Sequence, residues 1–420
     1  MVNFNQWTCG ERLSPYVKYW LPNHLILPVW REMAMNRPHI VLVLTGVLGV
    51  VPAAAESPIA ISSQVETGWT SNATDSAAGG EDFYVRHSHD LSLTGGTDAL
   101  VLRGSLAISQ TRFAVTQFED DAEVTGAIEA QLALGETASL RLGYAVTQSW
   151  TGDDLSVLGL VIPVQSTKTS HEYIAEYTLL GDDQQVTVGV TADWILAGDS
   201  ILEGLGLPPL QLSADVGSVT GRVAWERALS PSMALLTGME AWFTLISEDD
   251  QLTYFRAPAD GGRVAAGLRV VDGILSIEGL GGFDLVWPKG FSELTRTMPH
   301  VAVVASLKPM EVVKLALKAE TGVELVDPLD GVAGRTAAVD LGATWAFTPA
   351  VTLSATLAAE QEWGLFDESV SRFARTASLG VRYAVSEQIS YGATLSWSRH
   401  DDPGESYDKT GVAMSLTGAF

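Results

Sequence analysis

Apolar and polar residues alternate with a period of two through most of the chain. Within 138–147 the even-numbered residues are apolar, and the odd-numbered ones are small or polar. The same alternation recurs over 100–109, 185–194 and 352–360. A period of two is that of a β-strand, and segments of about ten residues can cross a bilayer as tilted strands. The pattern therefore predicts a repeated series of strands of membrane-crossing length.

A soluble antiparallel sandwich also alternates, so the choice between the two architectures needs further features. The polar faces are rich in Gly, Ala, Ser and Thr and poor in Lys, as expected for a crowded barrel interior. Tryptophans tend to mark strand ends, as interfacial girdles do; these are Trp69, Trp150, Trp194, Trp225, Trp345, Trp363 and Trp397. We therefore predict an all-β fold, a transmembrane antiparallel up-and-down β-barrel.

The N-terminal region has the order of a secretory signal peptide. Ile40 to Val51 is the longest apolar stretch, too short for the roughly 20 residues of a membrane-spanning helix. Arg37 precedes it and small residues follow it, so we expect cleavage after Ala55. Residues 35–55 are the predicted signal, and 1–34 are interpreted as a start-site extension, with a long signal or a propeptide as the alternative. Residues 56–420 form the predicted barrel domain.

Short turn sequences separate the alternating runs and give the strand count. They lie near 95–96, 135–136, 181–182, 230–231, 272–273, 308–309, 348–349 and 386–387. Eight turns join sixteen strands, and runs near 59–69 and 409–420 raise the number to eighteen. Sixteen is the alternative if the weak run 299–307 is not a strand. An even number places both ends of the barrel on the periplasmic side. Continuous strands from the signal to Phe420 leave no room for a plug or passenger domain.

The connections at the other end of the predicted strands are longer and mostly acidic, and we interpret them as extracellular loops. They contain Glu119 to Asp121, Asp153 and Asp154, Glu248 to Asp250, Asp327 with Asp330, Asp367 and Glu368, and Asp401 and Asp402. Clustered carboxylates could bind Ca²⁺, although simple solvation is the favoured interpretation. Two segments, Leu155 to Val164 and Ile201 to Leu212, are instead apolar. They are expected to cover the mouth, narrow the lumen, or contact lipid, another subunit or a hydrophobic substrate.

Cysteine content and charge exclude several kinds of chemistry. Cys9 is the only cysteine, so the mature chain would have no disulfide, thiol nucleophile or cysteine-based metal site. Without residues 1–55 the chain keeps 21 basic and 48 acidic residues, a net charge of −27 that repels nucleic acids. We expect no cofactor and no catalytic or metal site. His87, His89 and Asp90 flank Ser88, but neighbouring strand residues point to opposite faces, which prevents local Ser–His attack geometry.

Charged residues within the strands fall out of phase with the apolar face. Turning Arg or Lys toward lipid at the bilayer midplane costs about 2–4 kcal/mol, so these residues are predicted to line the lumen. They could order permeating solutes by their electric field or brace the wall as ion pairs, and the sequence favours neither interpretation. The predicted lumen residues are Arg103, Arg141, Arg222, Arg263, Arg269, Lys314, Lys318, Arg382, Glu129, Glu172, Glu176, Asp193, Glu226, Glu278, Glu320, Asp340 and Glu360.

The C-terminal hairpin carries a resemblance. Residues 391–399 end in Trp-Ser-Arg, an acidic loop follows, and Tyr407-Asp begins a final alternating strand that ends at Phe420. This region resembles the end of Gram-negative outer-membrane barrels, in particular a poorly characterised family from alphaproteobacteria and exopolysaccharide loci. The resemblance covers about 30 residues and implies outer-membrane insertion but no substrate. It also implies an insertion signal read by the barrel-assembly machinery, with Val412, Met414, Leu416 and Phe420 on one strand face.

These observations predict a porin-like channel in the cell outer membrane. It would pass small solutes or export a polymer through a water-lined barrel. The alternative is a structural or adhesive barrel whose lumen is filled by its own side chains and whose acidic loops face the surroundings. An outer-membrane hydrolase is less favoured. Expected partners are outer-membrane lipid, lipopolysaccharide and the assembly machinery, without nucleic acid; the oligomeric state is left open.

Overall fold

Eighteen strands account for most of the residues that the structure describes. The computed structural model describes residues 59–420 except 78, 158–159, 203, 291–293 and 327. The expected start-site extension and signal peptide lie outside this range. The strands are β1 Ile59–Thr70, β2 Asp82–Thr97, β3 Leu100–Phe113, β4 Asp121–Ala133, β5 Ala138–Val157, β6 Leu160–Leu180, β7 Gln184–Leu202, β8 Val216–Ser230, β9 Met233–Ile246, β10 Ala259–Asp272, β11 Leu275–Pro288, β12 Arg296–Met310, β13 Val313–Glu324, β14 Gly334–Ala346, β15 Val351–Gly364, β16 Ser371–Ala384, β17 Ile389–Asp402 and β18 Glu405–Ala419.

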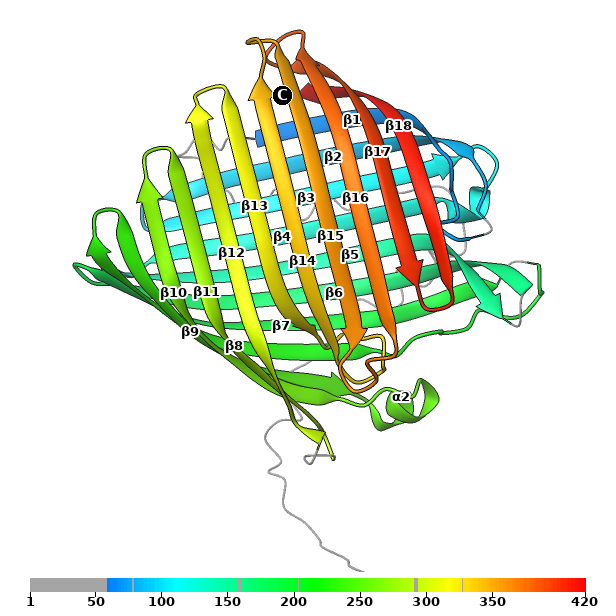
Figure 1. The fold of residues 1–420 in the computed structure, drawn as a ribbon, viewed down its shortest axis with the longest axis horizontal. Coiled ribbons are helices and arrows are strands. Elements are labelled where there is room, and N and C mark those ends of the chain that lie inside the picture. Colours follow the sequence, from blue (N-terminus) through cyan, green and yellow to red (C-terminus); the bar gives the residue numbers. More distant parts are fainter. Residues whose placement is uncertain (1–58, 78, 158–159, 203, 291–293, 327) are drawn as a thin grey trace, which may run out of the picture. The chain divides into compact units, whose positions relative to one another are not determined.

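The strands form one closed antiparallel sheet. Each strand pairs with the next along the chain, and β1 also pairs with β18, from Ser62 opposite Ala419 to Thr70 opposite Gly411. Backbone hydrogen bonds of 2.8 Å in both directions between Ile61 and Phe420 complete this seam. Figure 1 shows the later strands crossing in front of the earlier ones at a steep angle. The predicted barrel of eighteen strands is therefore confirmed, and the weak run 299–307 lies within β12.

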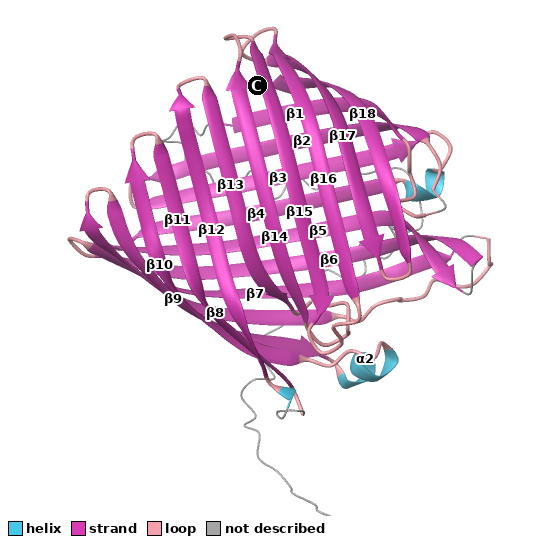
Figure 2. Cartoon of the chain, viewed as in Figure 1, coloured by secondary structure: helices cyan, strands magenta, loops and turns pink. Residues whose placement is uncertain are grey.

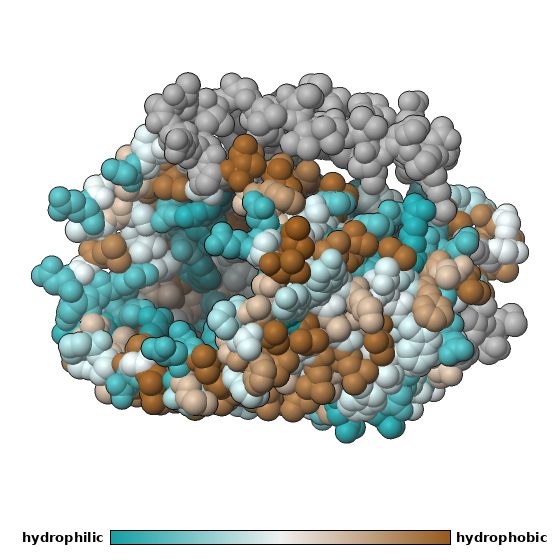
Figure 3. Space-filling model, turned by 90° about the horizontal axis from the view of Figure 1, so that it is seen from above, coloured by the Kyte–Doolittle hydropathy of each residue, from teal (hydrophilic) through white to brown (hydrophobic). Residues whose placement is uncertain are grey.

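The alternating pattern sorts side chains between the two faces of the wall. Large apolar residues of one phase, such as Leu142, Val188 and Leu357, are more than 40% exposed, so they form an outer surface rather than a core. Most residues of the other phase are polar or small and face inward, with large apolar exceptions such as Trp242 and Val286. Seen from above, hydrophilic residues surround the hollow and hydrophobic ones gather on the outer side (Figure 3). The exposed apolar band is what a lipid-embedded barrel requires.

The two ends of the barrel differ in their connections. Short turns join the strands at the end that holds Ile59 and Ala419, which we call the turn end. Most connections at the other end, which we call the loop end, are longer, and among them are the short helical segments η1 Gln117–Glu119 and α2 Glu248–Thr253 (Figure 2). Ser247 caps α2, because its hydroxyl accepts the amide of Asp250 at 3.0 Å. Among the described residues, no helix is long and apolar enough to cross a membrane.

Several strands extend further than the sequence pattern indicates. Asp153 and Asp154 belong to β5, and Asp401 and Asp402 belong to β17, so these residues do not lie in loops. Most of the apolar segment 155–164 likewise continues the paired strands β5 and β6. Backbone pairing does not stop where the apolar band ends, because the hydrogen bonds of a hairpin are independent of side-chain polarity. The turn expected near 308–309 lies at 311–312, after a register shift between Leu307 and Met310.

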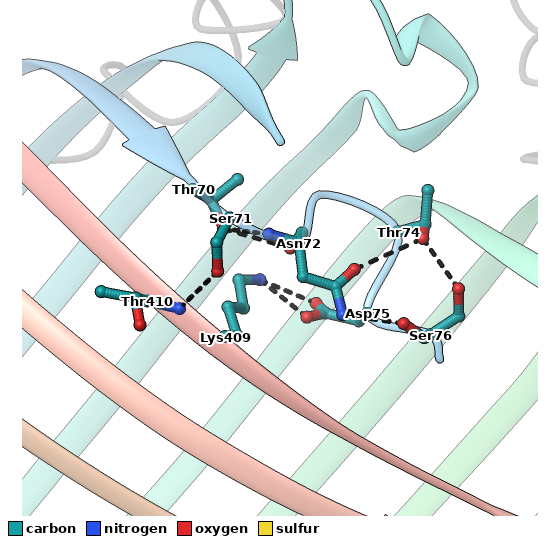
Figure 4. Close-up of polar contacts among 8 residues, drawn as sticks. All are labelled: Thr70, Ser71, Asn72, Thr74, Asp75, Ser76, Lys409 and Thr410. Atoms are coloured by element: carbon teal, nitrogen blue, oxygen red, sulfur yellow. Dashed lines mark hydrogen bonds and ion pairs between the residues drawn. The ribbon is translucent and has the colours of Figure 1, made fainter. Parts of the chain in front are cut away.

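The connection between β1 and β2 covers the loop end of the closing seam. Figure 4 shows Lys409 of β18 reaching Asp75, whose carboxylate oxygens accept from its Nζ at 2.8 and 2.9 Å. The Ser71 hydroxyl accepts the amide of Thr410 at 2.8 Å, and the Ser71 amide donates back to the Thr410 carbonyl. Asp75 has a positive φ of 49°, which bends the loop toward β18. The seam is thus held by side chains as well as by strand pairing.

Candidate functional site

The lumen contains the charged residues that the strand pattern selects. The register places every predicted lumen residue on the inner face of its strand, because each pairs with an inward residue of the neighbouring strand. Direct cross-strand neighbours include Arg103 and Glu129, Arg141 and Glu176, Glu172 and Asp193, Arg269 and Glu278, and Lys318 and Asp340. Two regions of the lumen wall hold charges in different environments, and further charged residues lie outside both.

The first region is a row of half-exposed ion pairs along β3 to β8, which we call the open ladder: Arg103, Glu129, Arg141, Glu176 and Arg222. Glu129 accepts from Arg103 Nη1 at 2.6 Å and pairs with Arg141 Nη2 at 2.8 Å. The side chains of these two arginines remain 50% and 42% exposed. The open ladder therefore borders water inside the barrel.

Gly189 makes room for one ion pair of the open ladder. Arg222 of β8 reaches Glu176 of β6 by crossing the intervening strand over Gly189. A Cβ atom on Gly189 would lie 3.1 Å from Nε of Arg222. The missing side chain thus opens the path for this ion pair.

Further ion pairs lie on β8, β10, β11 and β13, also toward the turn end. Arg269 bridges Glu226 and Glu278, at 2.7 and 2.8 Å. Lys318 pairs with Glu320 on its own strand at 3.2 Å. Lys314 and Arg382 also face inward, and Nε of Arg382 donates to the Ser390 hydroxyl at 3.0 Å.

The second region is a buried charge cluster on β9 to β12. Arg263 holds Asp284 through two hydrogen bonds, from Nε at 2.7 Å and Nη2 at 3.2 Å. Glu240 lies 3.5 Å from the same guanidinium, and His300 lies 3.8 Å from Asp284. The Asp284 and His300 side chains are only 2% and 3% exposed. Of this group only Arg263 is among the predicted lumen residues, although Glu240 and Asp284 are also out of phase with the apolar face of their strands.

Two loops cover the loop-end side of this cluster. Leu325 and Ala333 of the β13–β14 loop and Leu365 of the β15–β16 loop are buried with three inward side chains of the wall, Trp242, Val286 and Met298. We call the buried charges and this apolar layer together the capped region. These two loops are among the connections predicted to be acidic and extracellular, yet they supply the apolar cap. A cover over the mouth is expected instead from the apolar segments 155–164 and 201–212. Leu205 and Leu207 of that second segment are half-exposed.

A single carboxylate fastens the two loops together. Asp330 Oδ1 accepts the amides of Val332 and Ala333, both at 2.9 Å. Oδ2 accepts the amides of Phe366 and Asp367 at 2.6 and 3.3 Å. A carboxylate is well suited to this role because it offers about four lone-pair positions. Asp330 therefore joins the two loops by hydrogen bonds and is not one of a group of solvated surface carboxylates.

Other carboxylates at the loop end have similar structural roles. Asp82 Oδ2 accepts the amides of Val115 and Thr116 at 2.9 and 2.8 Å. Burial raises the pKa of Asp215, although the amide of Ala197 donates to it at 2.8 Å and opposes that shift. The Ser369 hydroxyl and amide hold the pKa of Asp367 below its usual value. Among the described residues, no group of three or more His, Cys, Asp or Glu could hold a metal ion.

Opposite walls approach each other on the loop-end side of the lumen. A space of about 520 Å³ is lined by residues of β6 and β7 on one side and of β13 to β16 on the other. Its acidic residues outnumber its basic ones. They are Glu172, Asp193, Glu324, Glu360 and Glu362, against Lys168 and Arg372. This acidic constriction lies beside the capped region.

The histidines of β2 do not enter the lumen. His87 and His89 pair with Val65 and Ser63 of the outer face, and His89 Nδ1 lies 3.0 Å from the Ser63 hydroxyl. Ser88 pairs with Gln64 and faces inward. The strand geometry thus separates Ser88 from both imidazoles, as the alternation predicts.

Comparisons with known proteins agree on the fold. No family model and no curated protein matches the chain. The copper transporter OprC matches with a TM-score of 0.52 at 9% identity, over 87% of this chain and 81% of that one. The siderophore receptor PirA from Acinetobacter baumannii gives 0.49 at 7% identity, over 86% and 80%. CdiB from Acinetobacter baumannii gives 0.44 at 12%, and the chain spans 60% of its length. The likeness to OprC shows the barrel fold alone and does not bear on the alphaproteobacterial family.

Proposed function

We propose that the chain is a water-filled channel of a Gram-negative outer membrane, through which small solutes pass without an energy source. The turn end would face the periplasm and the loop end the surroundings. The single observation that carries this proposal is the exposure of the open ladder. A lumen filled by its own side chains would bury its charges, yet the Arg103 and Arg222 side chains keep 50% and 45% of their surface exposed.

The capped region supports a size limit for this passage. The apolar cap fills part of the lumen beside β9 to β12, and the acidic constriction brings the remaining walls together. Solutes would have to pass between the cap and the opposite wall. Fixed constrictions of this kind let a wide barrel discriminate by size and charge.

The acidic constriction supports a preference for cations. Its carboxylates from β6, β7, β13 and β15 face one space, so their negative potentials add along the path. The arginines of the open ladder are each paired with a glutamate and contribute less net field. We therefore propose that small cations and neutral solutes pass more readily than anions.

Polymer export, the absence of catalysis and the expected partners are also proposals. The C-terminal resemblance keeps polymer export as the second candidate function. We propose no catalytic role, and we propose outer-membrane lipid and the assembly machinery as partners.

Planar-bilayer recordings test the channel proposal. The barrel, folded in detergent and added to a salt gradient, should give stepwise single-channel currents with a reversal potential on the cation side. The double variant Glu172→Gln with Asp193→Asn should move that potential toward zero. A matched control is Glu123→Gln, an inward carboxylate of β4 that does not line the constriction. Protein that inserts but carries no current would favour the structural barrel instead.

A further inference from the structure

Three arginines interrupt the apolar pattern on the outer face of β14 to β17. Arg375 and Arg399 lie directly opposite each other in the register of β16 and β17. The next outward pairs toward the turn end are Ala377 with Trp397 and Leu379 with Leu395, which are apolar. Arg335 lies on the same outer face of β14, opposite Trp363. We call these three arginines the outer-rim patch.

The outer-rim patch lies near the loop end. Arg399 is close to the end of β17 at Asp402, and Arg335 directly follows the first residue of β14. An outward arginine costs about 2–4 kcal/mol at the bilayer midplane but only about 0–1 kcal/mol near the interface. Trp363, a residue of the kind that marks interfaces, lies at the same level. The outer-rim patch is therefore at the depth of lipid headgroups.

The guanidiniums of Arg375 and Arg399 keep most of their donors available, whereas Nε of Arg335 is buried. Within the described residues, their one hydrogen bond runs from Arg399 Nε to Asp401 Oδ1 at 3.3 Å. Looser ion pairs join Arg375 to Asp401 at 3.8 Å and Arg399 to Asp408 at 3.9 Å. The side chains of Arg375 and Arg399 are 49% and 43% exposed.

Aromatic rings hold two of these cations in place. The Arg375 guanidinium lies 4.5 Å from the ring centroid of Phe373, and that of Arg335 lies 5.6 Å from Trp363. Stacking fixes the plane of a guanidinium and leaves its N–H edge free to bind a planar or tetrahedral oxyanion with two hydrogen bonds. With Asp401 and Asp408 included, the five charges leave an excess of one positive charge.

We propose that the outer-rim patch binds phosphate groups of the glycolipid in the outer leaflet. Phosphate is the anion that outer-leaflet headgroups present at this depth, and arginine forks match its oxygens. Asp401 holds Arg375 and Arg399 side by side so that one phosphate can contact both. The proposal rests on the membrane placement proposed above but not on conductance, so a non-conducting barrel would leave it intact.

Binding of purified lipid A to the detergent-folded barrel tests the proposal. Lipid A with its phosphates and the same lipid after dephosphorylation are titrated separately, and bound lipid is counted by native mass spectrometry. The triple variant Arg335→Gln, Arg375→Gln and Arg399→Gln should bind phosphorylated lipid A more than about tenfold more weakly, since each lost charge-assisted hydrogen bond contributes appreciably. The single variant Arg375→Gln should lose part of the affinity. It keeps the proposal testable if the triple variant fails to fold.

The matched control is Arg227→Gln. Arg227 is also an outward arginine, but it lies at the turn end and pairs with Asp183 at 3.2 Å. It should leave lipid binding unchanged. Equal binding of phosphorylated lipid A by the triple variant and the unaltered barrel would overturn the proposal, as would equal affinity for the dephosphorylated lipid. Displacement of the lipid by equimolar inorganic phosphate would identify a free-anion site and also overturn it.

Discussion

The open ladder and the capped region use the same residue types inside one barrel, but their surroundings differ. In the open ladder, Glu129 joins two arginines that remain about half-exposed. In the capped region, Asp284 joins Arg263 beneath an apolar layer and is almost fully buried. Charge pairs that face water contribute little to stability, whereas breaking a buried pair leaves an uncompensated charge. In the proposed channel, the open ladder would tune passage, while the capped region fixes the shape of the wall.

The largest expected effect comes from breaking the buried pair. Asp284→Ala leaves Arg263 without its two-point acceptor and should lower the free energy of unfolding by about 3–5 kcal/mol. Urea titrations in lipid vesicles, followed by tryptophan fluorescence, measure this change. Glu129→Gln in the open ladder is the matched control and should cost about 1 kcal/mol or less. Equal losses in the two variants would show that the regions do not differ energetically.

Releasing the cap tests whether it narrows the lumen. Asp330→Ala removes the acceptor of four backbone amides and should cost about 2–4 kcal/mol, at about 1 kcal/mol for each bond. Because the two loops would separate, single-channel conductance should rise and larger solutes should pass in liposome-swelling assays. Asp367→Ala removes a neighbouring exposed carboxylate that bonds only within its own loop, to Ser369, and should leave conductance unchanged. A conductance unaffected by Asp330→Ala would exclude the cap as the limiting element.

The contrast between the regions also shows how far the sequence predicts the structure. Strand number, closure and the inward phase of charges follow from local alternation, because a β-strand assigns each residue to a face. The alternation does not predict the partners of Arg263, nor does it predict that the β13–β14 and β15–β16 loops fold into the barrel. Asp330 bonds to amides in a loop more than thirty residues away, and its role depends on the register of the two intervening strands, β14 and β15. From the local sequence, Asp330 can only be predicted to be an acidic residue in a loop.

Paired arginines of the open ladder and of the turn-end pairs should influence selectivity more than stability. Replacing Arg103, Arg141 and Arg269 together by Gln leaves Glu129, Glu226 and Glu278 without these partners. The reversal potential in a salt gradient should move further toward cations, while the free energy of unfolding falls by about 1 kcal/mol or less for each pair. An unchanged reversal potential would remove these side chains from the permeation path.

The smallest expected effect comes from Gly189→Ala, which disturbs a single ion pair of the open ladder, Arg222 with Glu176. Gly189→Ala places a Cβ about 3.1 Å from Arg222 Nε, too close for the present path of that side chain. Arg222 is flexible and half-exposed, so it can swing into the lumen, give up Glu176 and cost less than about 1 kcal/mol. Gly143→Ala is the matched control, because its Cβ would meet Ile174 at an ordinary 3.6 Å. A small cation shift for Gly189→Ala, with no shift for Gly143→Ala, is expected in bilayer recordings. A loss of several kcal/mol instead would mean that the ladder braces the wall as strongly as the capped region does.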